Sequence, residues 1–170
     1  GDISTACTFD EMDIILKPNA ILPSKARYYR NTPLMREEVR RQIQEQLDAG
    51  IISKMPTAVV SNVLMVKRPH MPGRYRFVVD YRAVNEATVP DVLLMPDVKS
   101  QHDRLANKSI FGAVDITSYY RLINLKQSCR YLTGFATEDG TYVYNRVPMG
   151  VRNACTHAQR VLQEKLADDP

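Results

Sequence analysis

The chain has 170 residues, of which 44% are hydrophobic and 25% are charged, and its formal net charge is +4 at pH 7. A chain of this length can bury roughly 70% of its unfolded surface in one domain, and a modest basic excess is compatible with a polyanionic partner. The cysteines Cys7, Cys129 and Cys155 are too widely spaced for a disulfide framework or a Cys-x-x-Cys metal site. No apolar run approaches the ~18 residues of a membrane span. We therefore expect an intracellular protein, in the cytoplasm or nucleus, with no membrane partner.

The first thirty residues predict a loop-like arm. Pro18 and Pro23 break any long element, and the basic run Lys25-Ala26-Arg27-Tyr28-Tyr29-Arg30 follows them. We expect this arm, residues 1–30, to lie over the core.

A helix is predicted directly after the arm. Thr32 is a suitable N-cap, Pro33 suits the first helical position, and Gly50 suits the C-terminal end. Apolar residues recur every four positions between them, as expected for one buried helical face: Met35, Val39, Ile43 and Leu47. The remaining Arg, Glu and Gln side chains are predicted to form a solvated face.

Residues 59–79 predict a two-stranded hairpin whose turn is supplied by Pro69 to Gly73. Val63 and Met65 alternate with polar or smaller neighbours on one strand, as do Tyr75, Phe77 and Val79 on the other. The hairpin also gathers a basic cluster, Lys67, Arg68, Arg74, Arg76 and Arg82, interleaved with Tyr75, Phe77 and Tyr81. Charge combined with aromatic rings is typical of nucleic-acid backbone neutralisation and base stacking. The alternative is an ordinary solvated hairpin tip.

The rest of the chain alternates short elements with connections. Pro90 and Pro96 place residues 86–100 in a connecting stretch, and a short helix is expected from Asp97 to Leu105. A second hairpin is predicted to join 131–136 to 141–147 through Glu138-Asp139-Gly140, and a last helix is predicted over 153–167.

An aspartate, Asp115, ends the apolar run Ile110-Phe111-Gly112-Ala113-Val114. A carboxylate at the end of a buried strand is costly to desolvate unless it lies at a rim or binds a cation. Asp115 is therefore a candidate metal ligand, and the alternative is a strand-terminal Asp that caps the next turn.

The segments at 47–52, 61–85, 110–120 and 142–154, in this order and spacing, resemble the reverse transcriptase of gypsy-type LTR retrotransposons and, more distantly, of retroviruses. The resemblance covers roughly residues 10–167. It implies an α+β fold, with reverse-transcriptase-like fingers and a partial palm built from an antiparallel sheet with packed helices. The implied division is an arm at 1–30, fingers at 31–90 and partial palm at 91–170, with the hairpin at 131–147 assignable to either. An intracellular location that includes virus-like particles would fit this family.

The resemblance implies the chemistry of an RNA-directed DNA polymerase, which transfers deoxynucleotides onto a primer by a two-metal mechanism with Mg²⁺ or Mn²⁺. Asp115 would be the catalytic carboxylate and a metal ligand, and the carbonyl of Ile116 a further ligand. The dNTP would be bound by residues matching the family's nucleotide pocket: Arg68, Arg76, Tyr119, Tyr120, Met149 and Gly150. The RNA or DNA template-primer would contact a second set: Lys67, Arg74, Tyr75, Arg82 and Asn153.

The sequence also departs from the family pattern. Tyr119 replaces a glycine, Cys155 a proline and Met149 a phenylalanine or glutamine, and the hairpin tip is longer and less basic than usual. The Tyr-x-Asp-Asp hairpin with the other metal carboxylates is expected beyond Pro170, and Asp168-Asp169 is interpreted as a helix-terminal pair. We therefore expect the chain alone to be inactive, and expect self-association through the incomplete sheet edge or pairing of that edge with the arm. The alternative function is a non-catalytic module that binds nucleic acid or a protein partner.

Overall fold

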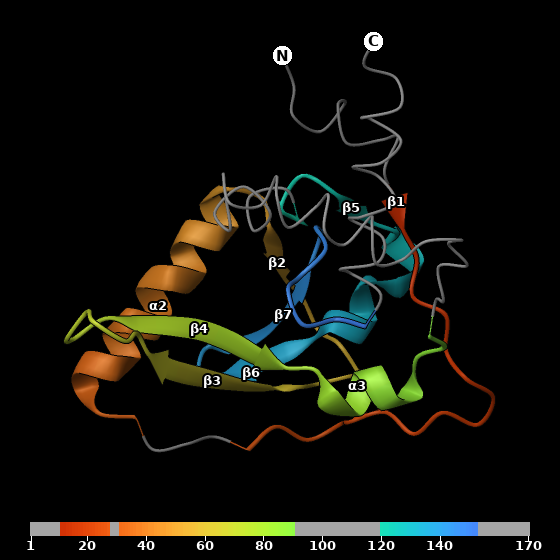
Figure 1. Cartoon of the computed structure of the whole chain (residues 1–170), viewed down its shortest axis with the longest axis horizontal. Coiled ribbons are helices and arrows are strands. Elements are labelled where there is room, and N and C mark those ends of the chain that lie inside the picture. Colours follow the sequence, from red (N-terminus) through yellow and green to blue (C-terminus); the bar gives the residue numbers. More distant parts are fainter. Residues whose placement is uncertain (1–10, 28–30, 91–119, 153–170) are drawn as a thin grey trace, which may run out of the picture.

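The computed structural model of the protein describes residues 11–27, 31–90 and 120–152 (Figure 1). Three predicted elements lie outside these ranges: the helix at 97–105, the strand that ends at Asp115 and the helix at 153–167. Four predicted site residues lie outside them as well: Asp115, Ile116, Tyr119 and Asn153.

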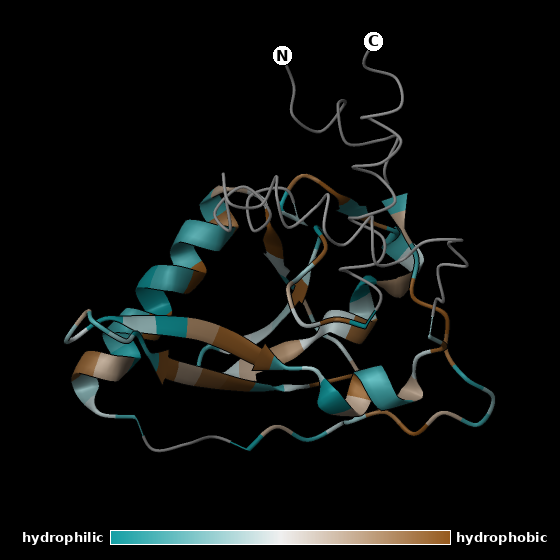
Figure 2. Ribbon diagram, viewed as in Figure 1, coloured by the Kyte–Doolittle hydropathy of each residue, from teal (hydrophilic) through white to brown (hydrophobic). Residues whose placement is uncertain are grey.

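The predicted helix is confirmed as α2, Pro33–Asp48. The Thr32 side chain accepts a hydrogen bond from the Met35 amide at 3.2 Å, as an N-cap residue should. Gly50 follows the helix with φ +71°, a conformation that favours glycine. Val39 and Ile43 of the apolar stripe are buried, whereas most of the helix surface is hydrophilic (Figure 2).

The long hairpin is confirmed as β3, Asn62–Lys67, paired antiparallel with β4, Tyr75–Asp80. The register sets Val63 opposite Val79 and Met65 opposite Phe77. These four side chains pack on the core, as the predicted alternation requires. The hairpin meets α2 near its tip and leads into a short helix, α3, Arg82–Ala87, at its other end (Figure 1).

The second hairpin is shorter than predicted. Its strands are β6, Phe135–Thr137, and β7, Gly140–Tyr144. The prediction was wrong for 131–133, which lie in a 3₁₀ helix, η1, Gln127–Thr133. The reason is the Thr133 hydroxyl, which donates to the Arg130 carbonyl at 2.6 Å and accepts from the Tyr144 amide at 2.8 Å. A side chain therefore takes the place of a strand partner at that position.

The predicted strand over 141–147 also ends early, because its last amides bond elsewhere. The Asn145 amide donates to the Ile51 carbonyl at 2.8 Å, and the Val147 amide donates to the Ile123 carbonyl at 3.0 Å.

Several described elements were not predicted from the sequence, among them β2, Ile52–Lys54, and α3. The strand β2 pairs antiparallel with β7, which gives a sheet of order β2-β7-β6. The helix α3, Arg82–Ala87, begins where the Asp80 carboxylate accepts the Arg82 amide at 3.2 Å. Since β2 lies in the predicted fingers, 31–90, and β7 in the predicted palm, 91–170, this sheet joins the two predicted parts. The boundary between fingers and palm stays a prediction.

The described residues of the arm pack against the core, and the division that assigns 1–30 to an arm stays a prediction. The strand β1, Glu11–Met12, pairs in parallel with β5, Asn124–Leu125. Met12 and Ile14 are buried in the core cluster. Pairing of the arm with the strand ending at Asp115 is untested, because that strand lies outside the described residues.

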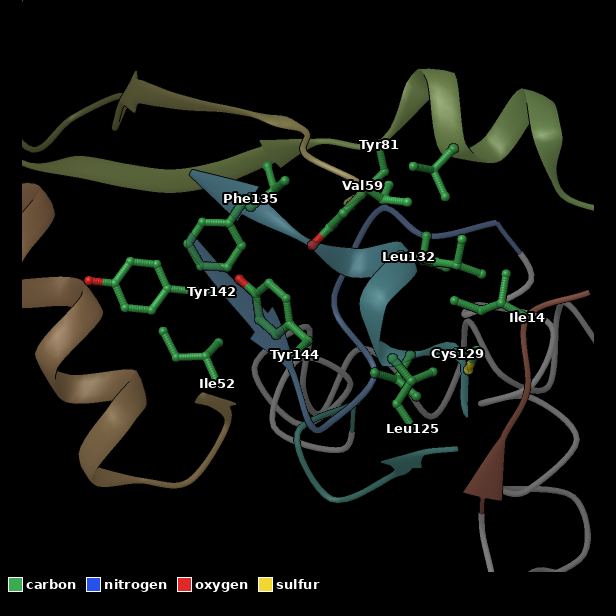
Figure 3. Packing of buried hydrophobic residues seen from close by; sticks show 14 of the residues in the cluster. Ile14, Ile52, Val59, Tyr81, Leu125, Cys129, Leu132, Phe135, Tyr142 and Tyr144 are labelled. Atoms are coloured by element: carbon green, nitrogen blue, oxygen red, sulfur yellow. The ribbon is translucent and has the colours of Figure 1, made fainter. Parts of the chain in front are cut away.

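The core centres on aromatic side chains from β6 and β7 (Figure 3). The Phe135 ring stacks on Tyr142 and is tilted against Tyr144, in each case with 5.5 Å between ring centroids. Cys129 is a free, buried thiol at the edge of this cluster, and burial raises its pKa to about 11. Among the described residues, no helix is long and apolar enough to cross a membrane.

Candidate functional site

A cavity of about 410 Å³ lies between α2, the long hairpin and the loop that follows β7. Five of the six predicted nucleotide-binding residues line it: Arg68, Arg76, Tyr120, Met149 and Gly150. They come from three segments of the chain, at 68–76, 120 and 149–150. The sixth, Tyr119, lies outside the described residues.

The hairpin supplies the two arginines. Arg76 lies on β4 opposite Val66, with an exposed side chain, and Arg68 opens the tip. The tip closes through the Arg68 amide, which donates to the Arg74 carbonyl at 3.0 Å. Within the tip, His70 has φ +68° and Gly73 has φ +79°, so the turn uses the left-handed region twice.

Three tyrosines form the inner wall of the cavity. Tyr81 donates its hydroxyl to the Thr133 carbonyl at 2.8 Å, and Tyr144 donates to Gln46 Oε1 at 3.2 Å. Burial raises the pKa of both phenols, so both stay neutral donors at physiological pH. Tyr120 is 7% exposed and belongs to the core cluster while also lining the cavity.

Two of the three aromatic residues interleaved with the basic cluster pack in the core and are not exposed for base stacking. Tyr81 is buried, and Phe77 packs edge-on against Phe135 with 5.5 Å between centroids. Strand alternation turns Phe77 inward, and Tyr81, the residue after β4, is held in the core by the hydrogen bond from its hydroxyl to the Thr133 carbonyl. Tyr75 is half-buried and stays a candidate for contact with nucleic acid.

The loop after β7 forms one rim. Val147 and Val151 are buried at its two ends, whereas Met149 is 52% exposed. Gly150 between them has φ +93°. Its carbonyl accepts a hydrogen bond from Asn85 Nδ2 at 2.7 Å.

The charges around the cavity favour an anion. The described lining of the cavity contains three arginines, Arg68, Arg76 and Arg121, and one carboxylate, Glu45, which is ion-paired with Arg41. Three guanidinium groups around one opening suit phosphate oxygens, to which arginine can donate two parallel hydrogen bonds.

Sequence reasoning missed Arg121 and two α2 residues, Gln42 and Gln46. The polar face of α2 was expected to be solvated throughout, but both glutamines are half-buried and line the cavity. Gln42 Nε2 donates to the Tyr75 carbonyl at 3.0 Å, which ties α2 to β4. Their i, i+4 spacing beside the Ile43 and Leu47 stripe is the signal that could have identified them.

The predicted template-primer residues that fall within the described ranges are not among the residues that line the cavity. Lys67 and Arg74 are exposed at the ends of the tip. Arg82 forms an ion pair with Asp80 at 2.7 Å, and this contact holds the pKa of the Asp80 carboxyl below its usual range. Asn153 is outside the described residues. These assignments stay predictions.

Within the residues that the structure describes, no group of three His, Cys, Asp or Glu side chains could hold a metal ion. The predicted ligands Asp115 and Ile116 lie outside that part of the chain. The metal site therefore stays a prediction.

Residues 65–168 match the family model described as reverse transcriptase (RNA-dependent DNA polymerase). The chain belongs to this family. It is 35% identical over 156 residues to the retrovirus-related Pol polyprotein from transposon opus of Drosophila melanogaster, which covers 90% of this chain and 16% of that protein. It is 34% identical over 147 residues to the enzymatic polyprotein of cauliflower mosaic virus, strain Strasbourg, covering 84% of this chain and 22% of that protein. The chain thus spans less than a quarter of the length of these relatives, and its assignment to the gypsy type stays a prediction.

Solved structures of reverse transcriptases share this fold, which confirms the predicted α+β architecture. The foamy viral protease-reverse transcriptase in complex with dsDNA matches with a TM-score of 0.70 at 18% identity, covering 96% of this chain and 31% of that one. The same enzyme in complex with an RNA/DNA hybrid matches with a TM-score of 0.67 at 16% identity, covering 91% and 21%.

Proposed function

We propose that this chain forms the nucleotide-binding side of an RNA-directed DNA polymerase. The observation that carries the proposal is the single cavity that gathers Arg68, Arg76, Tyr120, Met149 and Gly150. These residues were assigned to a dNTP pocket on the sequence alone, and the fold brings them together from distant segments.

Each side chain suits one part of a deoxynucleoside triphosphate. Arg76 and Arg68 present guanidinium groups for the phosphates, and Arg121, which also lines the cavity, adds a third positive charge. Tyr120 offers an aromatic surface for the sugar. Gly150 lacks a side chain and lets the ligand approach the backbone closely.

The metal part of the proposal concerns residues outside the described ranges. Nucleotidyl transfer needs divalent metal ions held by hard oxygen ligands, which activate the primer hydroxyl and neutralise the triphosphate. Asp115 and the Ile116 carbonyl are the proposed ligands in this chain. Mg²⁺ is the proposed ion, with Mn²⁺ as a substitute.

The proposed macromolecular partner is an RNA or DNA template with its primer. Lys67, Arg74, Tyr75 and Arg82 lie on or beside the long hairpin, next to the cavity, and Asn153 is proposed by resemblance. The printed titles of the similar solved structures describe complexes with dsDNA and with an RNA/DNA hybrid, which supports this choice. Neither the family match nor the fold favours the alternative of a non-catalytic binding module. An intracellular location stays a prediction.

Nucleotide binding by the chain itself tests the proposal. Titration calorimetry with dGTP and Mg²⁺ should show saturable binding, and Arg76→Gln should weaken it by about tenfold or more, because a charge-assisted hydrogen bond is lost. Arg36→Gln is the matched control, since it removes the same charge from an arginine that pairs with Glu138 and lies outside the cavity. The control should bind as the parent does. Equal losses in both variants, or no binding by the parent, would contradict the proposal.

A further inference from the structure

The side chain of Asn85 connects α3 to the rim of the cavity. Its amide nitrogen donates to the Gly150 carbonyl at 2.7 Å, and its amide oxygen accepts from the Arg152 backbone N–H at 2.5 Å. The Asn85 side chain thus both donates to and accepts from the backbone of one loop, which lies more than sixty positions further along the chain. Asn85 itself is not in the described lining of the cavity.

The helix α3, which carries Asn85, is anchored in the core by buried side chains and hydrogen bonds. Val84, the preceding residue in α3, is 0% exposed, and the Asn85 amide donates to the Tyr81 carbonyl at 2.8 Å. Tyr81 is in turn anchored to Thr133 through its hydroxyl. The position of the Asn85 side chain is thus set by the core.

The loop that Asn85 holds has little packing of its own at the rim. Met149 and Gly150 are exposed, whereas the flanking Val147, Pro148 and Val151 are buried. Gly150 also has a left-handed backbone conformation, which does not by itself favour one loop geometry, because glycine has access to many. The Arg152 side chain adds one bond from Nη1 to the Thr88 carbonyl at 3.2 Å, beyond the rim residues.

We propose that Asn85 is a positioning residue: it fixes the backbone of residues 149–152 and so sets the shape of the nucleotide cavity at Met149 and Gly150. This inference rests on the proposed function of the cavity. Asparagine suits the task because one end of its amide donates and the other accepts. Aspartate could accept from the Arg152 N–H but could not donate to the Gly150 carbonyl, and leucine, of similar size, could do neither.

Amide hydrogen exchange, measured by NMR on the folded chain, tests the positioning directly. Asn85→Leu should speed exchange of the Arg152 amide by about tenfold or more relative to the parent, because its acceptor is lost. Asn85→Asp should retain most of the protection at Arg152. Glu86→Gln is the control: it changes an exposed side chain of the same helix without touching the loop bonds, so exchange at Arg152 should stay as in the parent. Unchanged exchange at Arg152 in Asn85→Leu would overturn the positioning role.

Nucleotide affinity tests the consequence for the cavity. With dGTP and Mg²⁺, Asn85→Leu should raise Kd by roughly three- to tenfold, whereas the exposed-site control Glu86→Gln should change Kd less than about twofold at a temperature where both variants are folded. Faster exchange at Arg152 with an unchanged Kd would overturn the link between Asn85 and the nucleotide. Failure of the parent chain to bind dGTP would overturn the proposed function, while the exchange experiment would still decide whether Asn85 fixes the loop.

Discussion

The two antiparallel hairpins of this protein are built in different ways. In the short hairpin, Phe135 is 0% exposed, and Glu138 and Asp139 alone make the turn between β6 and β7. In the long hairpin, six pairs of residues join β3 and β4, and the tip over 68–74 is exposed throughout. One hairpin therefore forms the core, and the other projects charged groups from it.

Both hairpins are attached to α2, by contacts of different kinds. The turn of the short hairpin is held by two ion pairs, Arg36 to Glu138 at 2.9 Å and Arg40 to Asp139 at 2.8 Å. The long hairpin is held by the hydrogen bond from Gln42 to the Tyr75 carbonyl. The comparison indicates that stability resides mainly in the buried β6 and β7 side chains, and that the tip of the long hairpin is available for binding.

The largest expected effect is a loss of folding stability when the buried ring at the centre of the short hairpin is removed. Phe135→Ala should lower the free energy of unfolding by about 3–5 kcal/mol, because it removes a fully buried ring that contacts Phe77, Tyr142 and Tyr144. Denaturant unfolding followed by circular dichroism measures this loss. Val66→Ala on the long hairpin is the comparison variant, and its effect should stay within about 0.5 kcal/mol because Val66 is exposed. Similar losses in the two variants would contradict the division between the hairpins.

The next effect concerns binding by the long hairpin. The chain should bind nucleic acid weakly and without sequence preference, and its affinity should fall as salt rises. Replacing Arg74 and Arg76 by Glu should reduce the slope of log affinity against log salt by about 1 to 2. Fluorescence anisotropy with a labelled oligonucleotide at several salt concentrations measures the slope. Replacing Arg36 and Arg40 by Glu makes the same change of charge on α2 and is the control, which should keep the slope of the parent. An unchanged slope in the hairpin variant would place the binding surface elsewhere.

A smaller effect, on the pH dependence of stability, is expected at Glu38 of α2, which accepts a hydrogen bond from Gln42, the residue that joins α2 to the long hairpin. The hydrogen bond from Arg41, together with one from Gln42, lowers the pKa of the Glu38 carboxyl to about 2 from 4.5. Since the folded pKa is depressed, this contribution to stability is present above about pH 4.5 and is lost as the pH falls toward about 2. Glu38→Gln should therefore make the loss of stability between pH 4.5 and pH 2 less steep.

Urea unfolding across that pH range measures this dependence. Glu37→Gln, a change at the exposed neighbour on the same helix, is the control and should leave the steepness as it is in the parent. A Glu38→Gln variant with the same acid dependence as the parent would show that the contact contributes nothing to stability.

The smallest effect is expected at the turn of the short hairpin. Arg40 hydrogen-bonds to Asp139 through two atoms and lowers the pKa of that carboxyl, but both side chains are exposed to solvent. Exposed ion pairs are screened by water and salt. A double-mutant cycle with Arg40→Gln and Asp139→Asn should give only a slight coupling at low salt and none at high salt. A coupling that persists at high salt would show that the turn depends on this pair.

The sequence by itself determined the elements whose signals are local. The N-cap, the proline at the first position and the four-residue apolar spacing define α2. Residues at every second position, with a Pro/Gly turn between the two runs, indicate the strands β3 and β4. Recognisable blocks in order also identified the family and assigned residues to a nucleotide pocket.

Only the tertiary structure decided what depends on distant partners. The 3₁₀ helix over Gln127–Thr133 replaces a predicted strand because the Thr133 hydroxyl satisfies the Tyr144 amide. The strand β2 exists because β7 pairs with it, and Phe77 and Tyr81 proved to be core residues because Phe135 and Thr133 lie against them. The participation of Arg121 and Asn85 in or beside the cavity likewise depends on contacts between segments far apart in the chain, which no local pattern of residues encodes.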